Sequence, residues 1–432
     1  MSDESWYGRL PSHWDAGNIR RFALMKTGHT PSRQHPEYWT DCTIPWFTLA
    51  DVWQLRAGAR ELGETSERVS ELGLANSAAE LLPPGTVVLS RTASVGFSGI
   101  MPVSMATSQD FWNWVPKPGM LSRFLWYQLQ SMKPEFERLM MGSTHRTIYQ
   151  GDAASLRVVA PPIGEQRAIA DFLDRETAQI DAFIAKNEEL ITLLKERRRA
   201  TVRRAVTGGI GREIPTRPSG VAWLGDVPAH WSVAGLDRYA STVSGVGFPE
   251  RVQGIEDAEI AFYKVNSLGR ADVDGVIRKS WDTISRETAR SLRAKILPPG
   301  TILLAKIGAA LLLGRIRRTD RPACIDNNMM AIVPNEYLNP RFASYALQTF
   351  DFETLANPGT VPSMDMYALM HRETAIPPLV EQEEIADYLD RRLVGIDAAL
   401  ATCRRGVQLA AERRAALISA AVTGRIDLGV AA

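Results

Sequence analysis

Hydrophobic residues follow the three- and four-residue spacing of an amphipathic helix in two long stretches of the chain. The first stretch runs from Glu165 to Val206, without proline or glycine, and the second lies near the C-terminal end. At 1.5 Å per residue the first would form a helix of roughly 60 Å, longer than a small domain is wide. The stripes are Leu173, Glu176, Ile180, Phe183, Asn187, Leu190 and Leu194, then Leu389, Arg392, Ile396, Ala399, Cys403, Gly406 and Ala410.

These stripes predict a coiled-coil seam in which the two helices pack against each other. Asn187 is the polar position in the first stripe, and a residue of this kind often sets the register of two helices. The second stripe has smaller side chains, which suit close packing. We expect the packing residues to be Ile180, Phe183, Asn187, Leu190, Leu194, Leu389, Ile396 and Cys403.

The residues before each long helix have short apolar runs separated by glycine and proline. Many short strands with only one or two helices favour a compact α+β domain. We expect strands at residues 44–49, 86–89, 260–265, 301–304 and 331–333, and helices at residues 123–132 and 342–350.

The chain repeats itself at about half its length. Residues 6–23 return at 223–240, 82–86 at 297–301, and 161–182 at 377–398, always in the same order. Shorter matches join Arg123 and Tyr127 to Arg341 and Tyr345. A tandem duplication of about 216 residues explains this order, and two long repeats favour pseudo-twofold symmetry over a solenoid.

The pattern therefore predicts an α+β protein with an internal pseudo-twofold duplication. Two globular α/β domains, residues 1–160 and 211–375, are separated by two long antiparallel coiled-coil helices, residues 161–210 and 376–426. We expect the first helix to end at Thr207-Gly208. Residues inserted near Ala205 should then increase the separation of the domains.

Composition narrows the class of protein. The chain has 50 Lys and Arg residues and 49 Asp and Glu residues, so its net charge neither favours nor excludes binding to nucleic acid. No run of 18 apolar residues predicts a membrane span, and the N-terminus is too polar for a signal peptide. Three widely spaced cysteines suit a reducing cytosol, so we expect a cytoplasmic protein without a cysteine-based zinc site.

The motifs of several enzyme classes are missing from the sequence. Gly308 and Gly314-Arg315 lack the Lys-Ser/Thr of a phosphate-binding loop, and no HExxH or Cys/His cluster indicates a metal. The Asn/Asp-Pro-Pro-aromatic string of amino-methyltransferases is also missing. We therefore expect a chain with no catalytic residues, no bound metal and no cofactor of its own.

The order of these segments resembles the specificity (S) subunit of type I restriction-modification systems over essentially the whole chain. Pro-Pro-x-x-Glu-Gln before each long helix, at 161–166 and 377–382, is similar to the start of that family's helical regions. The landmarks that resemble its target recognition domains are residues 28–32, 37–39, 44–46, 90–96 and 142–144, then 325–330 and 359–363.

The resemblance implies two target recognition domains, each reading one half of a split, asymmetric target in double-stranded DNA. The helices would act as a ruler and dock two methyltransferase (M) subunits, and two restriction/motor (R) subunits would join them. S-adenosylmethionine, ATP and Mg²⁺ would be bound by those partners, and no membrane is involved.

Polar residues in loops flanked by glycine or proline are the candidates for DNA contact, because such side chains bind base edges and phosphates. Arg91 and Lys306 stand out, since the duplication places both after a repeated strand. The first domain offers Arg33, Arg91, Thr92, Ser94, Ser143, Thr144 and Arg146, and the second offers Arg251, Gln253, Lys264, Asn266, Lys306, Asn327, Asn328 and Ser363.

Other features favour structural roles or leave alternatives open. We expect Trp6, Trp14, Trp223, Trp231, His13 and His230 to pack where each domain begins. The basic residues Lys195, Arg197, Arg198, Arg199, Arg203 and Arg204 could line DNA, face a partner or form a solvated surface. A coiled-coil adaptor with two protein-binding domains is the alternative function, and a metal-dependent nuclease is a third.

Overall fold

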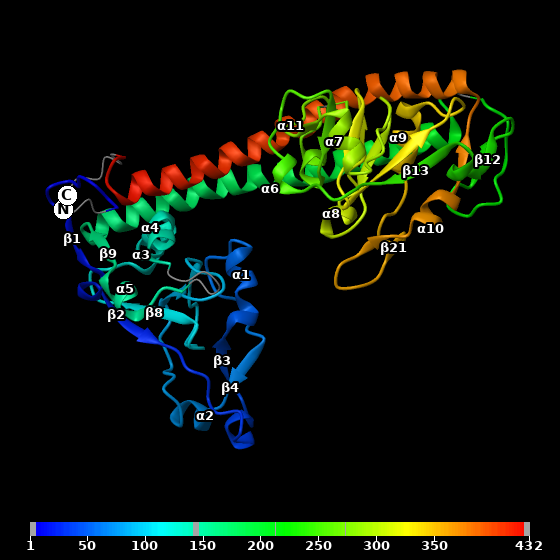
Figure 1. Cartoon of the computed structure of the whole chain (residues 1–432). Helices are drawn as coiled ribbons and strands as arrows, with labels where there is room; N and C mark the ends of the chain where they lie inside the picture. Colours follow the sequence, from blue (N-terminus) through cyan, green and yellow to red (C-terminus); the bar gives the residue numbers. More distant parts are fainter. Residues whose placement is uncertain (1–5, 141–146, 212, 273, 427–432) are drawn as a thin grey trace. The chain divides into compact units, whose positions relative to one another are not determined.

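The computed structural model describes residues 6–140, 147–211, 213–272 and 274–426. The chain divides into two compact units, Met1–Asn187 with Gly406–Ala432, and Glu188–Arg405. The division falls inside both long helices, α6 (Ile163–Gly208) and α11 (Leu379–Val422) (Figure 1). Each unit therefore combines one sheet-containing domain with a segment of both helices.

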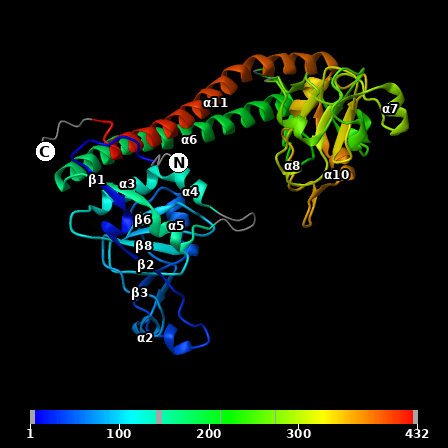
Figure 2. The ribbon, with the colours of Figure 1, turned by 60° about the vertical axis from the view of Figure 1, so that its left-hand side comes forward.

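The first domain is built on an antiparallel four-stranded sheet in the order β2-β8-β5-β6, with α3 beside it and a three-stranded sheet, β4-β3-β7, further from α6 (Figure 2). Strand β1 pairs with β9. The strands are β1 (Asp15–Asn18), β2 (Ala23–Thr27), β3 (Ile44–Phe47), β4 (Glu67–Val69), β5 (Val87–Ser90), β6 (Ser98–Ile100), β7 (Ala106–Thr107), β8 (Phe111–Pro116) and β9 (Arg157–Ala160). The helices are η1 (Ile19–Arg21), η2 (Pro36–Trp39), η3 (Leu49–Asp51), α1 (Trp53–Arg56), α2 (Glu71–Ala75), α3 (Ser122–Ser131), α4 (Lys133–Leu139) and α5 (Gln150–Ser155).

The second domain repeats this arrangement with a five-stranded sheet, β13-β20-β17-β18-β15, and a three-stranded sheet, β16-β14-β19. Three strand pairs, β12-β23, β10-β11 and β21-β22, complete it. The strands are β10 (Thr216–Pro218), β11 (Asp226–Pro228), β12 (Ser232–Gly235), β13 (Ala240–Ser244), β14 (Ile260–Tyr263), β15 (Val276–Ile277), β16 (Thr283–Ile284), β17 (Ile302–Ala305), β18 (Arg317–Thr319), β19 (Ala323–Ile325), β20 (Met329–Pro334), β21 (Ala356–Asn357), β22 (Ser363–Met364) and β23 (Glu373–Ile376). The helices are η4 (Leu236–Arg238), η5 (Glu250–Val252), η6 (Val265–Gly269), α7 (Arg286–Ser291), α8 (Ala309–Leu312), α9 (Pro340–Leu347) and α10 (Met366–His371).

The two domains share their topology, which confirms the predicted duplication and the α+β class. Strand β3 pairs in parallel with β7 and antiparallel with β4, as β14 does with β19 and β16. The predicted strands form within about two residues of the expected limits. The expectation of one or two helices per domain is wrong, because each domain also has helices of four to seven residues. Helices this short span barely two turns, so their sequences show no helical period.

Both long helices contribute to the core of each unit. In the first unit, Leu173 of α6 and Val422 of α11 are buried in one hydrophobic cluster with Phe124 of α3. In the second unit, Val206 of α6 and Leu389 of α11 share a cluster with other buried residues of the second domain. Much of each hydrophobic stripe therefore faces a domain as well as the other helix.

The middle of the predicted seam on α6 is less buried than its spacing suggested. Phe183 and Leu190 are 48% and 44% exposed, whereas Leu389, Ile396 and Cys403 on α11 are buried. Ile180, Asn187 and Leu194 are half-buried, and the Asn187 amide donates to the Phe183 carbonyl oxygen on its own helix. Phe183 and Leu190 belong to neither domain's hydrophobic cluster, whereas Leu173 and Val206 nearer the ends of α6 do, so the middle of the helix has no domain core to cover it.

Candidate nucleic-acid interface

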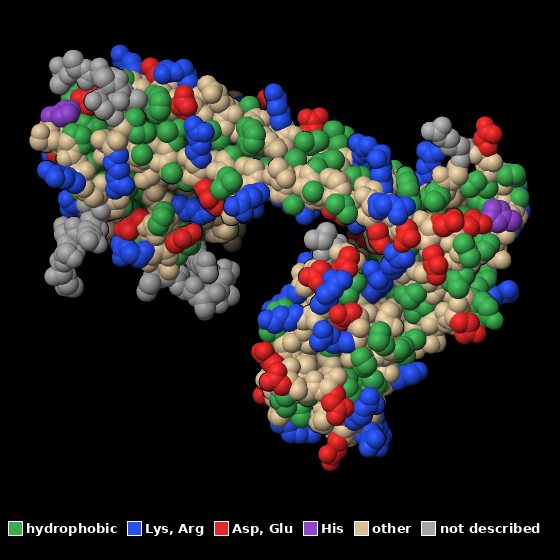
Figure 3. All heavy atoms as spheres, turned by 90° about the horizontal axis from the view of Figure 1, so that it is seen from above, with side chains coloured by type: hydrophobic (Ala, Val, Ile, Leu, Met, Phe, Trp, Pro, Cys, Tyr) green, Lys and Arg blue, Asp and Glu red, His purple; other side chains and the backbone are tan. Residues whose placement is uncertain are grey.

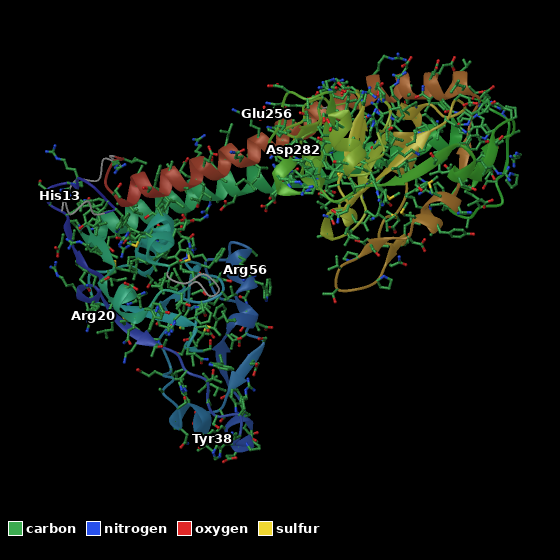
Figure 4. The ribbon with its side chains drawn as sticks, in the orientation of Figure 1. His13, Arg20, Tyr38, Arg56, Glu256 and Asp282 are labelled. Atoms are coloured by element: carbon green, nitrogen blue, oxygen red, sulfur yellow. The ribbon has the colours of Figure 1, made fainter. Side chains whose placement is uncertain are left out.

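A histidine–tryptophan pair fastens the beginning of each domain to a long helix. His13 Nε2 lies 2.8 Å from Glu165 Oε1, and Trp14 Nε1 donates to Glu165 Oε2 at 2.9 Å (Figure 4). In the second unit, His230 and Trp231 contact the two carboxylate oxygens of Glu381 at 2.6 and 2.9 Å. These contacts confirm a structural role for both pairs.

The glutamine that follows each of these glutamates connects the helix to its domain through backbone groups. Gln166 Oε1 accepts from the backbone N–H of Leu121 at 2.8 Å, and its amide donates to the carbonyls of Gly119 and Pro161. Gln382 makes the same three contacts, to Asn339, Tyr337 and Pro377. Because both glutamines are fully buried, these bonds satisfy groups that water cannot reach.

A third repeated contact joins α3 to α6 and α9 to α11. Arg123 Nη1 lies 2.6 Å from Asp174 Oδ2, and the Tyr127 hydroxyl donates to Asp174 Oδ1 at 2.6 Å. In the second unit, Arg341 and Tyr345 bind Asp390 in the same way. Burial, with the Asp174 hydrogen bond, raises the pKa of Tyr127 to about 12. Burial opposes ionisation of Asp174, but hydrogen bonds from Tyr127 and Arg123 hold its pKa below the usual range.

The residues that recur most clearly between the halves therefore hold each domain on its helices. Their side chains bond to other groups of the protein, so they are poor candidates for contact with a ligand. Residues that differ between equivalent loops of the two domains are the better candidates for sequence recognition.

The loop after β5 presents Arg91 in a fixed position. Its guanidinium carbon lies 4.4 Å from the centre of the Trp112 ring, and no described residue accepts a hydrogen bond from the guanidinium. The backbone N–H of Arg91 donates to the Asp110 carbonyl at 2.9 Å, and the Thr92 hydroxyl donates to the Asp110 carboxylate at 2.7 Å. Backbone hydrogen bonds thus hold Arg91 in place, while its guanidinium has no hydrogen-bond acceptor among the described residues.

Arg56 is a candidate that the sequence did not reveal. It ends α1, and its Nε donates at 2.9 Å to the hydroxyl of Ser94 in the loop after β5 (Figure 4). Ser94 is buried, so its hydroxyl positions Arg56 and leaves little surface for DNA. No motif or repeat marks Arg56, because its contact depends on a helix and a loop that only the fold brings together.

Arg33 lies at another aromatic cluster in the first domain. Its guanidinium carbon is 3.6 Å from the centre of the Trp39 ring, and it forms an ion pair with Glu67. Its charge is therefore partly balanced before any ligand binds. Ser143, Thr144 and Arg146 lie outside the described residues.

In the second domain, the candidates before η6 form a connected polar group. Lys264 Nζ lies 2.7 Å from Asp282 Oδ2, and it also donates to Gln253 Oε1 at 3.2 Å (Figure 4 labels Asp282). Gln253 in turn donates to the Phe248 carbonyl at 2.7 Å. Arg251 and Asn266 are exposed on the 3₁₀ helices η5 and η6.

Lys306 occupies the position after β17 that Arg91 occupies after β5. Its backbone N–H donates to the Asn328 carbonyl at 2.8 Å, and its own carbonyl accepts from Met364 N–H at 2.8 Å. Asn327 is exposed, and Ser363 is half-buried in β22. The same backbone hydrogen bond therefore positions an arginine in the first domain and a lysine in the second.

Three of the basic residues of α6, Arg198, Arg199 and Arg203, line a pocket of about 720 Å³ within the second unit. Arg198 donates to Asp397 and Gln348, each at 2.9 Å, and Arg203 donates to the Trp223 carbonyl at 2.8 Å. Lysine and arginine side chains also occur along the face of the long helices in Figure 3. The pocket lining comprises Arg198, Arg199, Ala200, Val202, Arg203, Leu312, Leu313, Gly314 and residues 348–353.

The described part of the chain offers no sign of metal chemistry. No group of three or more histidine, cysteine, aspartate or glutamate side chains there could hold a metal ion. Within the same residues, no helix combines the length and apolar composition that a membrane span requires.

The chain is thus an internally duplicated protein. Each half attaches a sheet-rich domain to the long helices through the same contacts, and the halves differ in their loops. The family profile described as the type I restriction modification DNA specificity domain matches residues 11–192 and 256–396. These segments make up well over half of the chain, which therefore belongs to the type I restriction-modification specificity subunits.

Individual relatives show the same similarity. The chain is 25% identical over 388 residues to the type I restriction enzyme MjaIX specificity subunit of Methanocaldococcus jannaschii, covering 87% of this chain and 85% of that one. It is also 25% identical to the EcoBI specificity subunit of Escherichia coli, over 55% of this chain and 52% of that one. A chain in a solved structure of a type I restriction-modification system has a similar fold, with a TM-score of 0.70. That match has 15% identity and covers 97% of this chain and all of the other.

Proposed function

We propose that this chain is the non-catalytic DNA-recognition subunit of a type I restriction-modification complex. Each domain reads one half of a split, asymmetric target in double-stranded DNA. The two helices hold the half-sites at a fixed spacing and dock two methyltransferase subunits. Two restriction/motor subunits join the assembly, and S-adenosylmethionine, ATP and Mg²⁺ bind to these partners.

The observation that carries the proposal is a common scaffold with different loop residues. Both domains position the residue after an equivalent strand through the same backbone hydrogen bond, yet it is Arg91 in one domain and Lys306 in the other. The acceptor carbonyl belongs to Asp110 in one and to Asn328 in the other. Different side chains on one backbone support different bases in the two half-sites, and hence a target without palindromic symmetry.

The equivalent loops also contain candidates that suit base or phosphate contact. Arg91 is half-buried and its guanidinium has no acceptor in the described part of the chain, and arginine binds guanine through two such donors. Asn327 and Asn328 in the second domain are of the residue type that binds adenine through two hydrogen bonds. Arg33, Thr92, Arg251, Gln253, Lys264, Asn266, Lys306 and Ser363 remain further candidates for contact with DNA.

A long-read methylome tests the function directly. Cells that express the chain with its methyltransferase subunit are compared with cells that lack only this chain. We expect a split, non-palindromic methylated adenine motif that disappears with the gene. An unchanged methylome with both proteins soluble, together with no sequence preference of the purified complex for DNA, would favour a protein-binding adaptor instead.

A pair of variants makes the same experiment specific for the recognition surface. Arg91→Ala removes a guanidinium that is paired with no described residue, whereas Arg21→Ala removes an exposed arginine already paired with Asp15 at 2.9 Å. We expect Arg91→Ala to reduce methylation of the motif and Arg21→Ala to leave it unchanged. Equal effects of the two variants would contradict recognition through the loop after β5.

A further inference from the structure

A group of arginine residues in the second domain has no carboxylate partner among the described residues. Arg317 Nε donates to the Leu268 carbonyl at 2.9 Å, at the end of η6. The Arg315 guanidinium lies beside Gly269. Its Nη1 is 3.1 Å from the place where the Cβ of any larger residue at position 269 would lie. The Arg270 guanidinium carbon lies 4.1 Å from the centre of the Trp281 ring. Arg315 and Arg317 thus lie beside the last residues of η6, and Arg270 is the residue that directly follows this helix.

The nearby acidic residues do not balance this charge. Asp272 and Asp274 bind Arg278, at 2.7 and 2.5 Å. Burial, together with repulsion from Arg315 and Arg198, lowers the pKa of Arg317. The like charges therefore lie close enough to destabilise one another, and an anion at this place would relieve their repulsion.

Trp281 holds two of the cations against its ring. Lys279 Nζ lies 5.3 Å from the ring centre, and Arg270 and Lys279 are both exposed side chains. Contact with an aromatic face restricts these long side chains before a ligand arrives, which reduces the entropy lost on binding. The ring supports a preformed, positively charged surface.

Among the described residues, the first domain has a glycine at the position equivalent to Arg317, as the strand registers show. Val87 pairs with Ile100 between β5 and β6, and Ile302 pairs with Arg318 between β17 and β18. Since residues 82–86 repeat at 297–301, Val87 corresponds to Ile302. Gly99, the residue before Ile100, therefore corresponds to Arg317. A Cβ on Gly99 would lie 2.6 Å from Leu55 Cδ2, so this position has no room for a side chain.

The arginine group is continuous with the candidate base-contacting residues. Helix η6 carries the exposed Asn266, follows Lys264, and ends just before Arg270. On the other side, Arg317 is near Arg198 of α6, where the basic pocket begins. The positive charge therefore extends beyond the residues suited to base contact, as expected for a surface that follows a phosphate backbone.

We propose that Arg270, Arg315 and Arg317, with Lys279 and Trp281, bind phosphate groups of duplex DNA beside the second half-site, as a backbone anchor that the first domain lacks. The inference rests on the proposed function. It predicts that the second domain contributes more of the salt dependence of binding, although both domains contribute to sequence choice.

The test uses the full-length chain in complex with its methyltransferase subunits and duplexes that carry the target found by the methylome. The double variant R270A/R315A removes two of the unpaired charges and leaves Arg317, which supports Leu268. The control variant R286A removes an exposed arginine of the same domain that is paired with Glu259 at 3.1 Å. Fluorescence anisotropy gives the dissociation constant between 50 and 200 mM salt for each protein, and melting temperatures confirm folding.

Each phosphate contact contributes about 0.9 to the slope of log affinity against log salt concentration. We expect the slope to fall by about 2 in R270A/R315A and to stay unchanged in R286A. The preference for the target over a scrambled duplex should remain, because phosphate contacts carry no base information. The loss should persist on a duplex that retains only the second half-site and disappear on one that retains only the first. If the double variant does not fold, R270Q should lower the slope by about 1.

The outcomes separate this inference from the proposed function. If the wild-type complex does not prefer its target, the proposed function fails. If the wild type discriminates but R270A/R315A keeps the wild-type slope, the phosphate anchor is refuted and DNA recognition stands. Loss of the methyltransferase subunit from the double variant, with an unchanged slope in the material that remains assembled, would identify the surface as a protein contact and also refute the anchor.

Discussion

Arg198 Nε donates to Asp397 Oδ1 at 2.9 Å, joining α6 to α11 within the second unit. Arg414 Nε donates to Asp181 Oδ1 at 2.8 Å within the first unit. Each residue of one pair lies 216 positions from its counterpart in the other, so the duplication exchanges the helices and preserves the contact. The helix segments in each unit run antiparallel, and the repeated ion pair marks their register.

We expect the two ion pairs to make small and unequal contributions to the free energy of unfolding. A double-mutant cycle of Arg198→Ala and Asp397→Ala should give a coupling energy of about 1 kcal/mol, because both side chains are mostly buried. The matching cycle of Arg414→Ala and Asp181→Ala should give less, since Asp181 is 51% exposed and water screens the pair. Thermal unfolding of the full-length variants measures both. A larger coupling for the Arg414–Asp181 pair would contradict the argument from burial.

The joint between α3 and α6 should lose stability in acid. The pKa of Asp174 is lower in the folded chain than its ordinary value of 3.8, so its ionised form stabilises the fold above about pH 4. This stability is lost as the pH falls through the folded-state pKa and the carboxylate is protonated. The melting temperature of the wild type should therefore fall more steeply than that of Asp174→Asn as the pH decreases below about 4. Parallel curves would show that Asp174 does not carry the effect.

Arg91 should determine one position of the first half-site. Arg91→Lys keeps the charge but removes the two-pronged donor, so discrimination at one base pair should fall by about 1–3 kcal/mol. Competition binding with single-base variants of the target measures this loss. Lys306→Arg in the second domain is a useful companion, because any new preference should appear in the other half-site. A uniform loss over all variants of the target would indicate a phosphate contact for Arg91.

The spacing between half-sites should depend on the middle of the helices and not on their ends. The sequence suggested an insertion near Ala205, but Ala205 is buried in the core of the second unit, so an insertion there would disrupt packing. Seven residues inserted after Asn187, with seven more before Gly406, preserve the faces of both helices and add about 10 Å. At 3.4 Å per base pair, the methylome should show a spacer longer by about three base pairs. An unchanged spacer in an active variant would refute the ruler.

The duplicated residues explain which parts of the fold could be predicted from sequence. The same contacts between domain and helix form twice, so the residues that make them recur. Comparing the two halves of the sequence therefore reveals them, as for Trp14, Glu165 and Gln166. The long helices were also predictable, since their hydrophobic period extends over many turns. The short helices and the half-exposed Phe183 were not, because few turns give little periodic signal and because burial along α6 depends on where the domain cores meet it.

The sequence by itself determined the duplication, the α+β domains, the long helices and the family, because these depend on local periodicity and on residues that recur in order. Only the tertiary structure decided which loop residues are engaged internally and which have free donors. Ser94 and Thr92 bond within the fold, Arg56 joins their loop from another element, and Arg315 and Arg317 lie beside the end of η6. Such contacts join segments distant in the chain, and their distances follow from the packing of whole domains rather than from any spacing in the sequence.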